Sequence, residues 1–249
     1  MIAESTHWYD QKGLPAYTIV GKNGKERNVN LRDARELNLV PSVTTILGVA
    51  AKPQLENWKI TESIRCAIEL TPFSNETLDQ FIQRAKRESK QKSIEASEKG
   101  TKIHAQIECG FSEKIESEPY LAVKKILDEL YPDYDWVAED SFSHPKGFGG
   151  KIDLYSPKGV VVDFKTKDNL KDKDPARLVY DEYGMQLSAY AYGLNMDNPE
   201  RVSIFIDRED NTAVYHKWDD SHDKHLEMFL SLLTYWQLSK GYKPEVLND

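Results

Sequence analysis

The chain has 249 residues, of which 39% are hydrophobic and 30% are charged, and its formal net charge is −8. This composition predicts a globular protein with a sizeable core, and it speaks against a protein that coats duplex nucleic acid through general positive charge. No apolar run is long enough to cross a membrane and the first residues show no secretory pattern, so we expect a cytoplasmic protein without a membrane partner.

Helical signals dominate the first half of the chain after one short hairpin. The hairpin is predicted over residues 14–30, around the turn sequence GKNGK. Pro41 and Ser42 are a typical helix start. Further helices are expected over residues 53–70, 74–100, 101–110 and 118–131. Within the first of these, Trp58 recurs with other apolar residues at helical spacing, so we expect its ring to pack in the core.

Strands and helices alternate in the second half. Strands are predicted over residues 134–142, 150–156, 159–165, 201–207 and 213–218. Helices are predicted over residues 176–194 and 219–240, and residues 166–177 form a charged loop that we expect to be mobile. The pattern predicts a single α/β domain over residues 1–249. Its parts would be an N-terminal hairpin extension (1–39), a helical part (40–131) and an α/β core (132–249).

Two aspartates lie in adjacent strands of a predicted hairpin. Asp163 follows three valines, and Lys165 shares its face of the strand because side chains alternate, whereas Phe164 points to the other face. An unpaired charge in a buried strand costs several kcal/mol (roughly 2–7 for an uncompensated polar group), so we expect these charges to be paired or to hold a metal. Asp153 lies across the turn, and the register, which the sequence leaves open, decides how close it comes.

Paired carboxylates favour a divalent cation, because the cation relieves their repulsion. Hard oxygen ligands select Mg²⁺ or Mn²⁺, and metal-bound water is easier to deprotonate than bulk water. With a lysine beside the metal, these parts describe phosphodiester hydrolysis. The alternative interpretation of Asp163 and Lys165 is an ion pair at the end of a strand.

Two further pairs have helical i, i+4 spacing and so share a helix face. His104 and Glu108 form the first pair, in which the histidine is either a metal ligand or a structural residue. Gln186 and Tyr190 form the second. The structural alternative is that Tyr190 packs in the core while Gln186 hydrogen-bonds a loop.

The order of these residues along the chain resembles the RecB-like branch of the PD-(D/E)XK nuclease superfamily. The motifs that carry the resemblance are His104, Gly150-x-x-Asp153, Asp163-Phe-Lys165-Thr166 and Gln186-x-x-x-Tyr190. The stretches PSVTTIL, LENWK and KGTKIHAQIE look like those of mitochondrial genome maintenance exonucleases and their phage relatives. The resemblance covers about residues 40–240. It implies a mixed central β-sheet flanked by helices, with an N-terminal helical elaboration, in a bacterial or phage-infected cell.

The resemblance also implies roles for individual residues. Expected metal ligands are His104, Asp153, Asp163 and the Phe164 backbone carbonyl, with Glu139 at a second metal. Expected catalytic residues are Asp153, Asp163, Lys165, Gln186 and Tyr190. Expected phosphate contacts are Ser42 and Thr44. Some RecB-like relatives carry a four-cysteine iron–sulfur cluster, which this chain cannot hold with only Cys66 and Cys109.

The leading hypothesis is a metal-dependent DNA exonuclease that acts on single-stranded ends in replication, repair or recombination, with one or two Mg²⁺ or Mn²⁺ ions. The alternatives are a duplex-end resecting exonuclease, a structure-specific endonuclease and a catalytically silent nucleic-acid-binding module. A non-haem iron oxygenase is disfavoured because its facial triad needs two histidines. A basic cluster is either a solvated helix face or a DNA-tracking stripe; its members are Arg84, Lys86, Arg87, Lys90 and Lys92.

Overall fold

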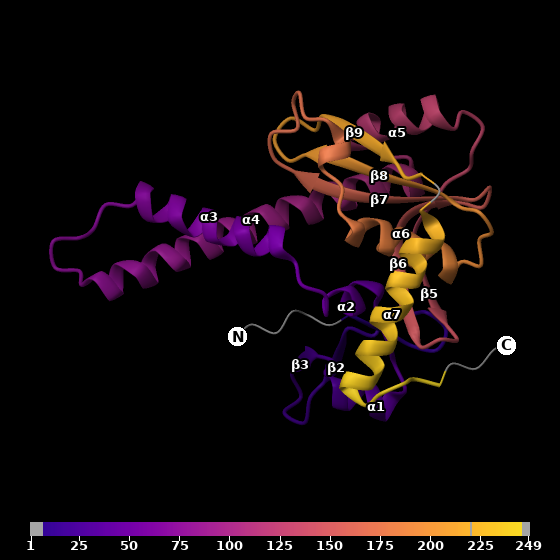
Figure 1. Cartoon of the computed structure of the whole chain (residues 1–249), viewed down its shortest axis with the longest axis horizontal. Coiled ribbons are helices and arrows are strands. Elements are labelled where there is room, and N and C mark those ends of the chain that lie inside the picture. The colour runs from indigo at the N-terminus through magenta and orange to yellow at the C-terminus, as the bar shows by residue number, and fades with distance from the viewer. Residues whose placement is uncertain (1–6, 220, 246–249) are drawn as a thin grey trace. The chain divides into compact units, whose positions relative to one another are not determined.

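A computed structural model describes residues 7–219 and 221–245 (Figure 1). Its strands are β1 (Trp8–Tyr9), β2 (Thr18–Val20), β3 (Glu26–Asn28), β4 (Val40–Pro41), β5 (Val137–His144), β6 (Phe148–Ser156), β7 (Val160–Lys167), β8 (Glu200–Asp207) and β9 (Ala213–Lys217). Its helices are α1 (Leu31–Leu37), α2 (Val43–Leu47), α3 (Pro53–Glu69), α4 (Leu78–Glu113), α5 (Glu118–Leu130), the 3-10 turn η1 (Pro175–Arg177), α6 (Asp181–Gly193) and α7 (His222–Lys240).

The central sheet has five strands in the order β5-β6-β7-β8-β9. Only β7 and β8 run parallel; the other neighbours are antiparallel. The β6–β7 hairpin turns at Gly159, whose φ of +94° is a conformation that glycine adopts without steric cost. The prediction of an α/β fold with a mixed sheet flanked by helices is therefore confirmed.

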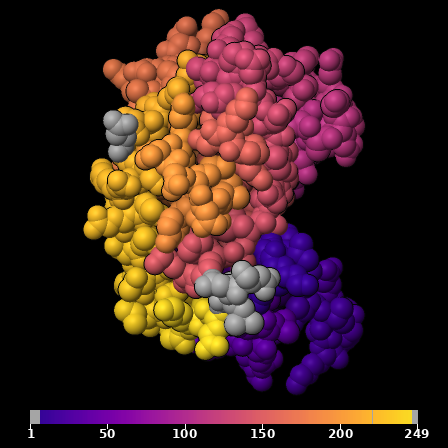
Figure 2. All heavy atoms as spheres, turned by 90° about the vertical axis from the view of Figure 1, so that its right-hand side faces the viewer, coloured from indigo at the N-terminus to yellow at the C-terminus, as the bar shows by residue number. Residues whose placement is uncertain are grey.

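Helix α6 packs against the sheet, and α7 packs on α6. In Figure 2 the yellow atoms of α7 run beside the orange atoms of α6 and the turn that follows it. Helix α6 lies close to the sheet because glycines at the contact leave room for aromatic rings. A Cβ at Gly193 would lie 2.0 Å from the Phe142 ring, and one at Gly150 would lie 2.8 Å from the Tyr190 ring.

The segment before α2 packs onto the sheet as well. The predicted hairpin over residues 14–30 is confirmed as β2 and β3. In addition, β1 pairs with β4, and Ser42 forms a bridge to Gly149 of β6. Because Gly149 has no side chain, the Tyr9 ring can pack against the backbone of β6; a Cβ at Gly149 would lie 3.1 Å from this ring. The short strands β1 and β4 were not predicted.

Three sequence predictions need correction. The helix predicted to end at Gly100 continues to Glu113, because one interior glycine costs only about 1 kcal/mol in a helix of 36 residues. The helix predicted from residue 176 begins at Asp181, after a 3-10 turn. The Trp58 ring is 40% exposed rather than packed in the core.

The charged loop after β7 is anchored at the end of β8 through Leu170. The Leu170 side chain is buried, and its backbone N–H donates to Asp207 Oδ2 at 2.8 Å. Asp207 lies at the end of β8 and is itself buried. The loop therefore has a fixed anchor.

The chain divides into two compact units. One unit holds the residues up to Val49 and those from His104 onward, including the sheet. The other, Ala50–Ile103, holds α3 and the first part of α4. The single domain predicted over residues 1–249 stays a prediction. Across residues 7–219 and 221–245, no helix has the length and apolar character to cross a membrane.

Candidate active site

Asp153 and Asp163 occupy facing positions where the β6–β7 ladder ends. The last paired residues on this side are Leu154 and Val162, and one further step in the same register sets the two aspartates opposite each other. There the Phe164 backbone N–H donates to Asp153 Oδ2 at 2.7 Å. The register that the sequence left open therefore brings the two carboxylate-bearing positions together.

Asp163 is almost completely buried, with 1% of its surface exposed. Its Oδ1 accepts a hydrogen bond from Gln186 Nε2 at 2.8 Å, and its Oδ2 lies 2.6 Å from Lys165 Nζ. Oδ2 accepts no hydrogen bond, so its contact with the ammonium is an ion pair without a directed bond. Burial raises the pKa of Asp163 to about 6 against the opposing charge of Lys165, and the charge of Asp153 adds to the rise.

Gln186 joins three of the predicted catalytic residues. Its Oε1 accepts from Lys165 Nζ at 3.1 Å, and its Nε2 donates to Asp163 Oδ1 and to the Tyr190 hydroxyl at 3.0 Å. Because Gln186 and Tyr190 are one turn apart on α6, they share a face of the helix; Gln186 contacts β7, and the Tyr190 ring packs at Gly150 of β6. Burial keeps the pKa of Tyr190 well above its usual value, so its hydroxyl stays protonated.

His104 reaches the same hairpin from α4. Its Nδ1 lies 3.6 Å from Asp153 Oδ1, and its ring meets the Phe164 ring edge-on at 5.9 Å. Burial opposes protonation of His104, but the hydrogen bond and charge of Asp153 outweigh it and raise the histidine pKa. Burial likewise acts to raise the pKa of Asp153, yet the combined effects of His104, Lys165 and the Phe164 N–H lower it.

The donor types at this place fit a hard divalent cation, since they are two carboxylates and one imidazole. Asp163 Oδ2 in particular is buried without a hydrogen bond and so retains acceptor capacity. Across the described residues, however, no three His, Cys, Asp or Glu side chains converge into a ready-made ligand cluster. A cation that used Asp163 Oδ2 would have to replace its contact with Lys165.

Glu139, the residue expected at a second metal, lies on β5 at an irregular point. Its φ is +56°, and the β5–β6 pairing skips from Ala138 to Asp140 on either side of it. Its carboxylate forms an ion pair with Lys151 of β6. A metal role for Glu139 stays a prediction, and it would require this ion pair to open.

Ser42 and Thr44, the expected phosphate contacts, lie at the start of α2. Ser42 is the N-cap: its Oγ accepts from the Thr45 N–H at 3.0 Å, and the side chain is buried. Thr44 is exposed, and its hydroxyl lies 3.0 Å from that of Ser42. Ser42 thus has a structural role as a helix cap, and the phosphate contacts stay predictions.

The basic cluster on α4 divides into two groups. Arg84 forms a two-pronged ion pair with Glu76, at 2.9 and 2.7 Å, and packs over the Phe73 ring. Lys92 is paired with Glu69 at 2.7 Å. The remaining three side chains are exposed; they are Lys86, Arg87 and Lys90. Arg84 and Lys92 thus connect parts of the helical unit, while the other three face solvent.

Two residues beside the site were missed from the sequence. Lys167 lies two positions beyond Lys165 on the same face of β7, and its Nζ donates to the Tyr183 hydroxyl at 3.1 Å. Tyr183 precedes Gln186 by one turn of α6, and its ring centroid lies 5.0 Å from Lys165 Nζ. The signal that could have found them is periodicity, because both extend the faces that carry the predicted residues.

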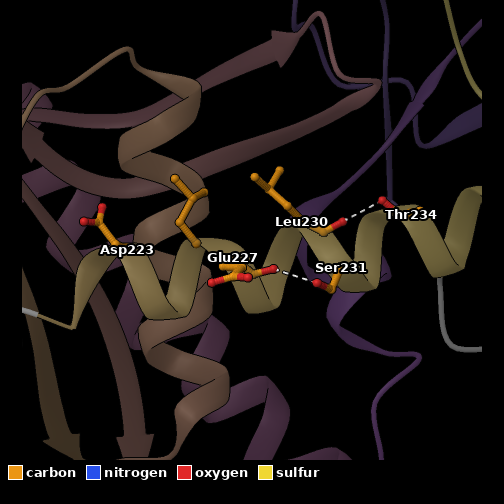
Figure 3. Close-up of a pocket in the computed structure, with 6 residues that line it drawn as sticks. Asp223, Glu227, Leu230, Ser231 and Thr234 are labelled. Carbon is orange, nitrogen blue, oxygen red and sulfur yellow. Dashed lines mark hydrogen bonds between the residues drawn. The ribbon is translucent and has the colours of Figure 1, made fainter.

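A pocket on the outer side of α7 contains none of the predicted site residues (Figure 3). Its lining comes from one helix, with Ser231 and Thr234 donating to backbone carbonyls one turn earlier at 2.9 Å. These two hydroxyls are occupied within the helix, and the other polar side chains of the lining are the carboxylates of Asp223 and Glu227.

No protein-family model matches the chain, and no curated protein matches it either. Among solved structures, an alkaline exonuclease from Laribacter hongkongensis is similar at 13% identity over 75% of this chain and 98% of that one, with a TM-score of 0.33. A putative exonuclease from Eubacterium rectale is similar at 15% identity over 68% and 67%, with a TM-score of 0.36. A phage-related exonuclease from Haemophilus somnus is similar at 12% identity over 57% and 82%, with a TM-score of 0.28.

These likenesses are distant and concern the fold alone. They do not support the closer resemblance to mitochondrial genome maintenance exonucleases drawn from the sequence.

Proposed function

We propose that this chain is a metal-dependent deoxyribonuclease that hydrolyses phosphodiester bonds, and that it acts as an exonuclease on single-stranded ends. The observation that carries the proposal is the placement of Asp153 and Asp163 in facing positions at the end of a buried ladder, with Lys165 against Asp163. A strand-end ion pair alone would not account for the second carboxylate or for the glutamine that joins the set.

Asp153, Asp163, His104 and the Phe164 carbonyl would hold the cation, which would be Mg²⁺ or Mn²⁺. When bound, it would supply an acidified water and neutralise charge on the phosphate. Lys165 would direct its ammonium toward the anionic phosphate, where a positioned donor contributes most in a partly dry site. Gln186 would fix the directions of Lys165 and Asp163, and Tyr190 would hold Gln186.

The preference for single strands rests on charge. With a net charge of −8, the chain offers little general attraction for a stiff duplex. The exposed cations Lys86, Arg87 and Lys90 offer a local attraction for phosphates, of the kind that follows the backbone of flexible single-stranded DNA.

The test is a time course with labelled DNA at one salt concentration, with Mg²⁺, with Mn²⁺ or with EDTA. The substrates are linear single strands, blunt duplex and circular single strands, and the matched control is Asp153→Asn. We expect metal-dependent loss of linear single strands, slower loss of duplex, and intact circles.

Other outcomes select other functions. Equal cutting of circles and linear strands would make the protein an endonuclease, and fastest loss of blunt duplex would make it a resecting exonuclease. Binding without any metal-dependent cleavage would leave a silent binding module and overturn the proposed activity.

A further inference from the structure

The inner face of β7 carries a second lysine beyond the proposed catalytic one. Lys165 and Lys167 share this face, about 6–7 Å apart along the strand, with their Nζ atoms 5.0 Å and 5.6 Å from the Tyr183 ring centroid. Lys167 Nζ also lies 5.5 Å from the Tyr180 ring centroid. Both tyrosines are half-buried, so the Lys167 ammonium lies between apolar walls rather than in open solvent.

Lys167 lacks the compensation that its neighbours have. Lys165 is paired with Asp163, and Arg208 is paired with Asp168 at 2.7 and 2.5 Å. Among the described residues, none forms an ion pair with Lys167, and the side-chain ammonium donates its hydrogen bond to the neutral Tyr183 hydroxyl. Burial and the charges of Lys165 and Arg208 lower the pKa of Lys167, against an opposing contribution from Glu182.

A half-buried ammonium beside other cations is an unfavourable arrangement unless an anion completes it. The Lys167 subsite, defined here as Lys167, Tyr180 and Tyr183, has the features of a phosphate contact. It has a donor fixed by a tyrosine hydroxyl and surroundings that weaken screening by water.

We propose that the Lys167 subsite binds a phosphodiester group of a single strand, adjacent to the phosphate that Lys165 engages. This inference deepens the proposed function and rests on it for the identity of the ligand. Lys167 would act by holding the strand in register, so it is a positioning residue and not a catalytic one.

The experiment measures binding in EDTA, so that it does not depend on cleavage. A fluorescein-labelled oligothymidylate is titrated with wild-type protein, Lys167→Met and Lys125→Met, and anisotropy is followed at several salt concentrations. Methionine keeps the aliphatic stem against the tyrosine rings and removes the charge. Lys125 is an exposed lysine of α5 that forms no ion pair among the described residues, so it controls for loss of one charge.

We expect Lys167→Met to weaken binding at least fivefold and to reduce the slope of log affinity against log salt by about 0.7, the value for one phosphate contact on a single strand. Lys125→Met should change neither quantity, and Lys167→Arg should retain most of the affinity. Thermal melting checks that each variant is folded; if Lys167→Met is not, Lys167→Gln takes its place.

Wild-type affinity and salt slope in a folded Lys167→Met would overturn the subsite, as would the absence of any salt-dependent DNA binding by the wild type. Normal wild-type binding without metal-dependent cleavage would overturn the proposed nuclease activity instead, and would leave the subsite to be judged by its own variants.

Discussion

The Asp153 carboxylate accepts a hydrogen bond from the Phe164 backbone N–H, with 2.7 Å between Oδ2 and the nitrogen. The Asp153 side chain thus takes the place of a backbone acceptor for β7, at the point where the hydrogen-bonded pairing of β7 with β6 ends. The bond fixes one carboxylate beside the strand that carries the other, so their proximity belongs to the fold of the hairpin itself. It also leaves Asp153 Oδ1 directed toward His104.

Replacing either aspartate should abolish cleavage without unfolding the protein. Asp153→Asn and Asp163→Asn keep the side-chain shape but remove the charge that would hold a cation, so we expect rates to fall by about 10³-fold or more. At neutral pH Asp163→Asn should melt at the same temperature or higher, because it no longer buries a carboxylate. Single-turnover cleavage and thermal melting measure both effects, and activity within tenfold of wild type would contradict the assignment.

Lys165 should affect the rate more than metal binding. Lys165→Ala removes the ammonium that we propose engages the phosphate, and we expect this loss to cost about 10²–10³-fold in rate, as for one preorganised donor. Mn²⁺ affinity, measured by calorimetry, should be equal or higher, because Asp163 Oδ2 loses its competing cation. Arginine should not restore full activity, since its planar fork differs from a compact ammonium. Normal cleavage by Lys165→Ala would reduce the lysine to an ion-pair partner.

Gln186 should matter more than Tyr190. Gln186→Leu leaves Asp163 Oδ1 and the Lys165 ammonium without their amide partner, so we expect about 1–3 kcal/mol of lost stability together with reduced cleavage. Tyr190→Phe keeps the ring that packs on Gly150 and removes only the hydroxyl, so its effects should be smaller. Urea unfolding and cleavage rates of the two variants decide the order, and a larger effect of Tyr190→Phe would contradict the network described above.

His104→Ala should weaken Mn²⁺ binding, with Glu108→Ala as the control one turn later on the same helix. His104 lies 3.6 Å from Asp153, and no ion pair of Glu108 exists among the described residues. We therefore expect a calorimetric loss of affinity for the histidine variant alone. Equal affinities of wild type and His104→Ala, with equal activity, would leave the histidine with a structural role.

His144 should make the fold sensitive to mild acid. Burial, with the charge of Lys146, lowers its pKa to about 4, while the unfolded chain takes up the proton near pH 6.5. The contribution of the neutral, buried His144 to the free energy of unfolding is thus fully present above pH 6.5, and it is lost as the pH falls toward 4. In His144→Asn an amide oxygen can replace Nδ1 as acceptor of the Lys146 N–H.

Urea unfolding of wild type and His144→Asn at pH 7 and pH 5, without metal, measures this effect. We expect the wild type to lose up to about 2 kcal/mol relative to the variant between the two values. A stability difference that does not change with pH would contradict the assignment.

Local periodicity predicted the parts of the site that lie on single elements. Alternation along β7 placed Asp163 and Lys165 on one face, and i, i+4 spacing placed Gln186 beside Tyr190. The distance from Asp153 to Asp163 was not predictable, because it depends on the turn register. The Lys167–Tyr183 contact was missed because a loop separates the strand from the helix that supplies the tyrosine.

Two errors have a common physical origin. Both predictions used only the local sequence. Gly100 was predicted to end a helix because glycine is a poor helix former, and Trp58 was predicted to pack in the core because it lies among apolar residues at helical spacing. Helix α4 continues because its packing extends over many more residues than the glycine weakens. Trp58 is exposed because α3 buries very little of its surface: of its 17 residues only Cys66 is buried.

The absence of a side chain at Gly150 has a consequence for how relatives of this chain should be recognised. A Cβ there would lie 2.8 Å from the Tyr190 ring, so a larger residue at position 150 requires this ring to shift or to be replaced by a smaller side chain. In an alignment of homologous sequences, a larger residue at position 150 should appear together with a smaller one at position 190. Such sequences would lose the tyrosine hydroxyl that accepts a hydrogen bond from Gln186. Gly150 and Tyr190 should therefore be read as one joint signature, 40 positions apart, whose paired loss would mark branches that have abandoned this arrangement.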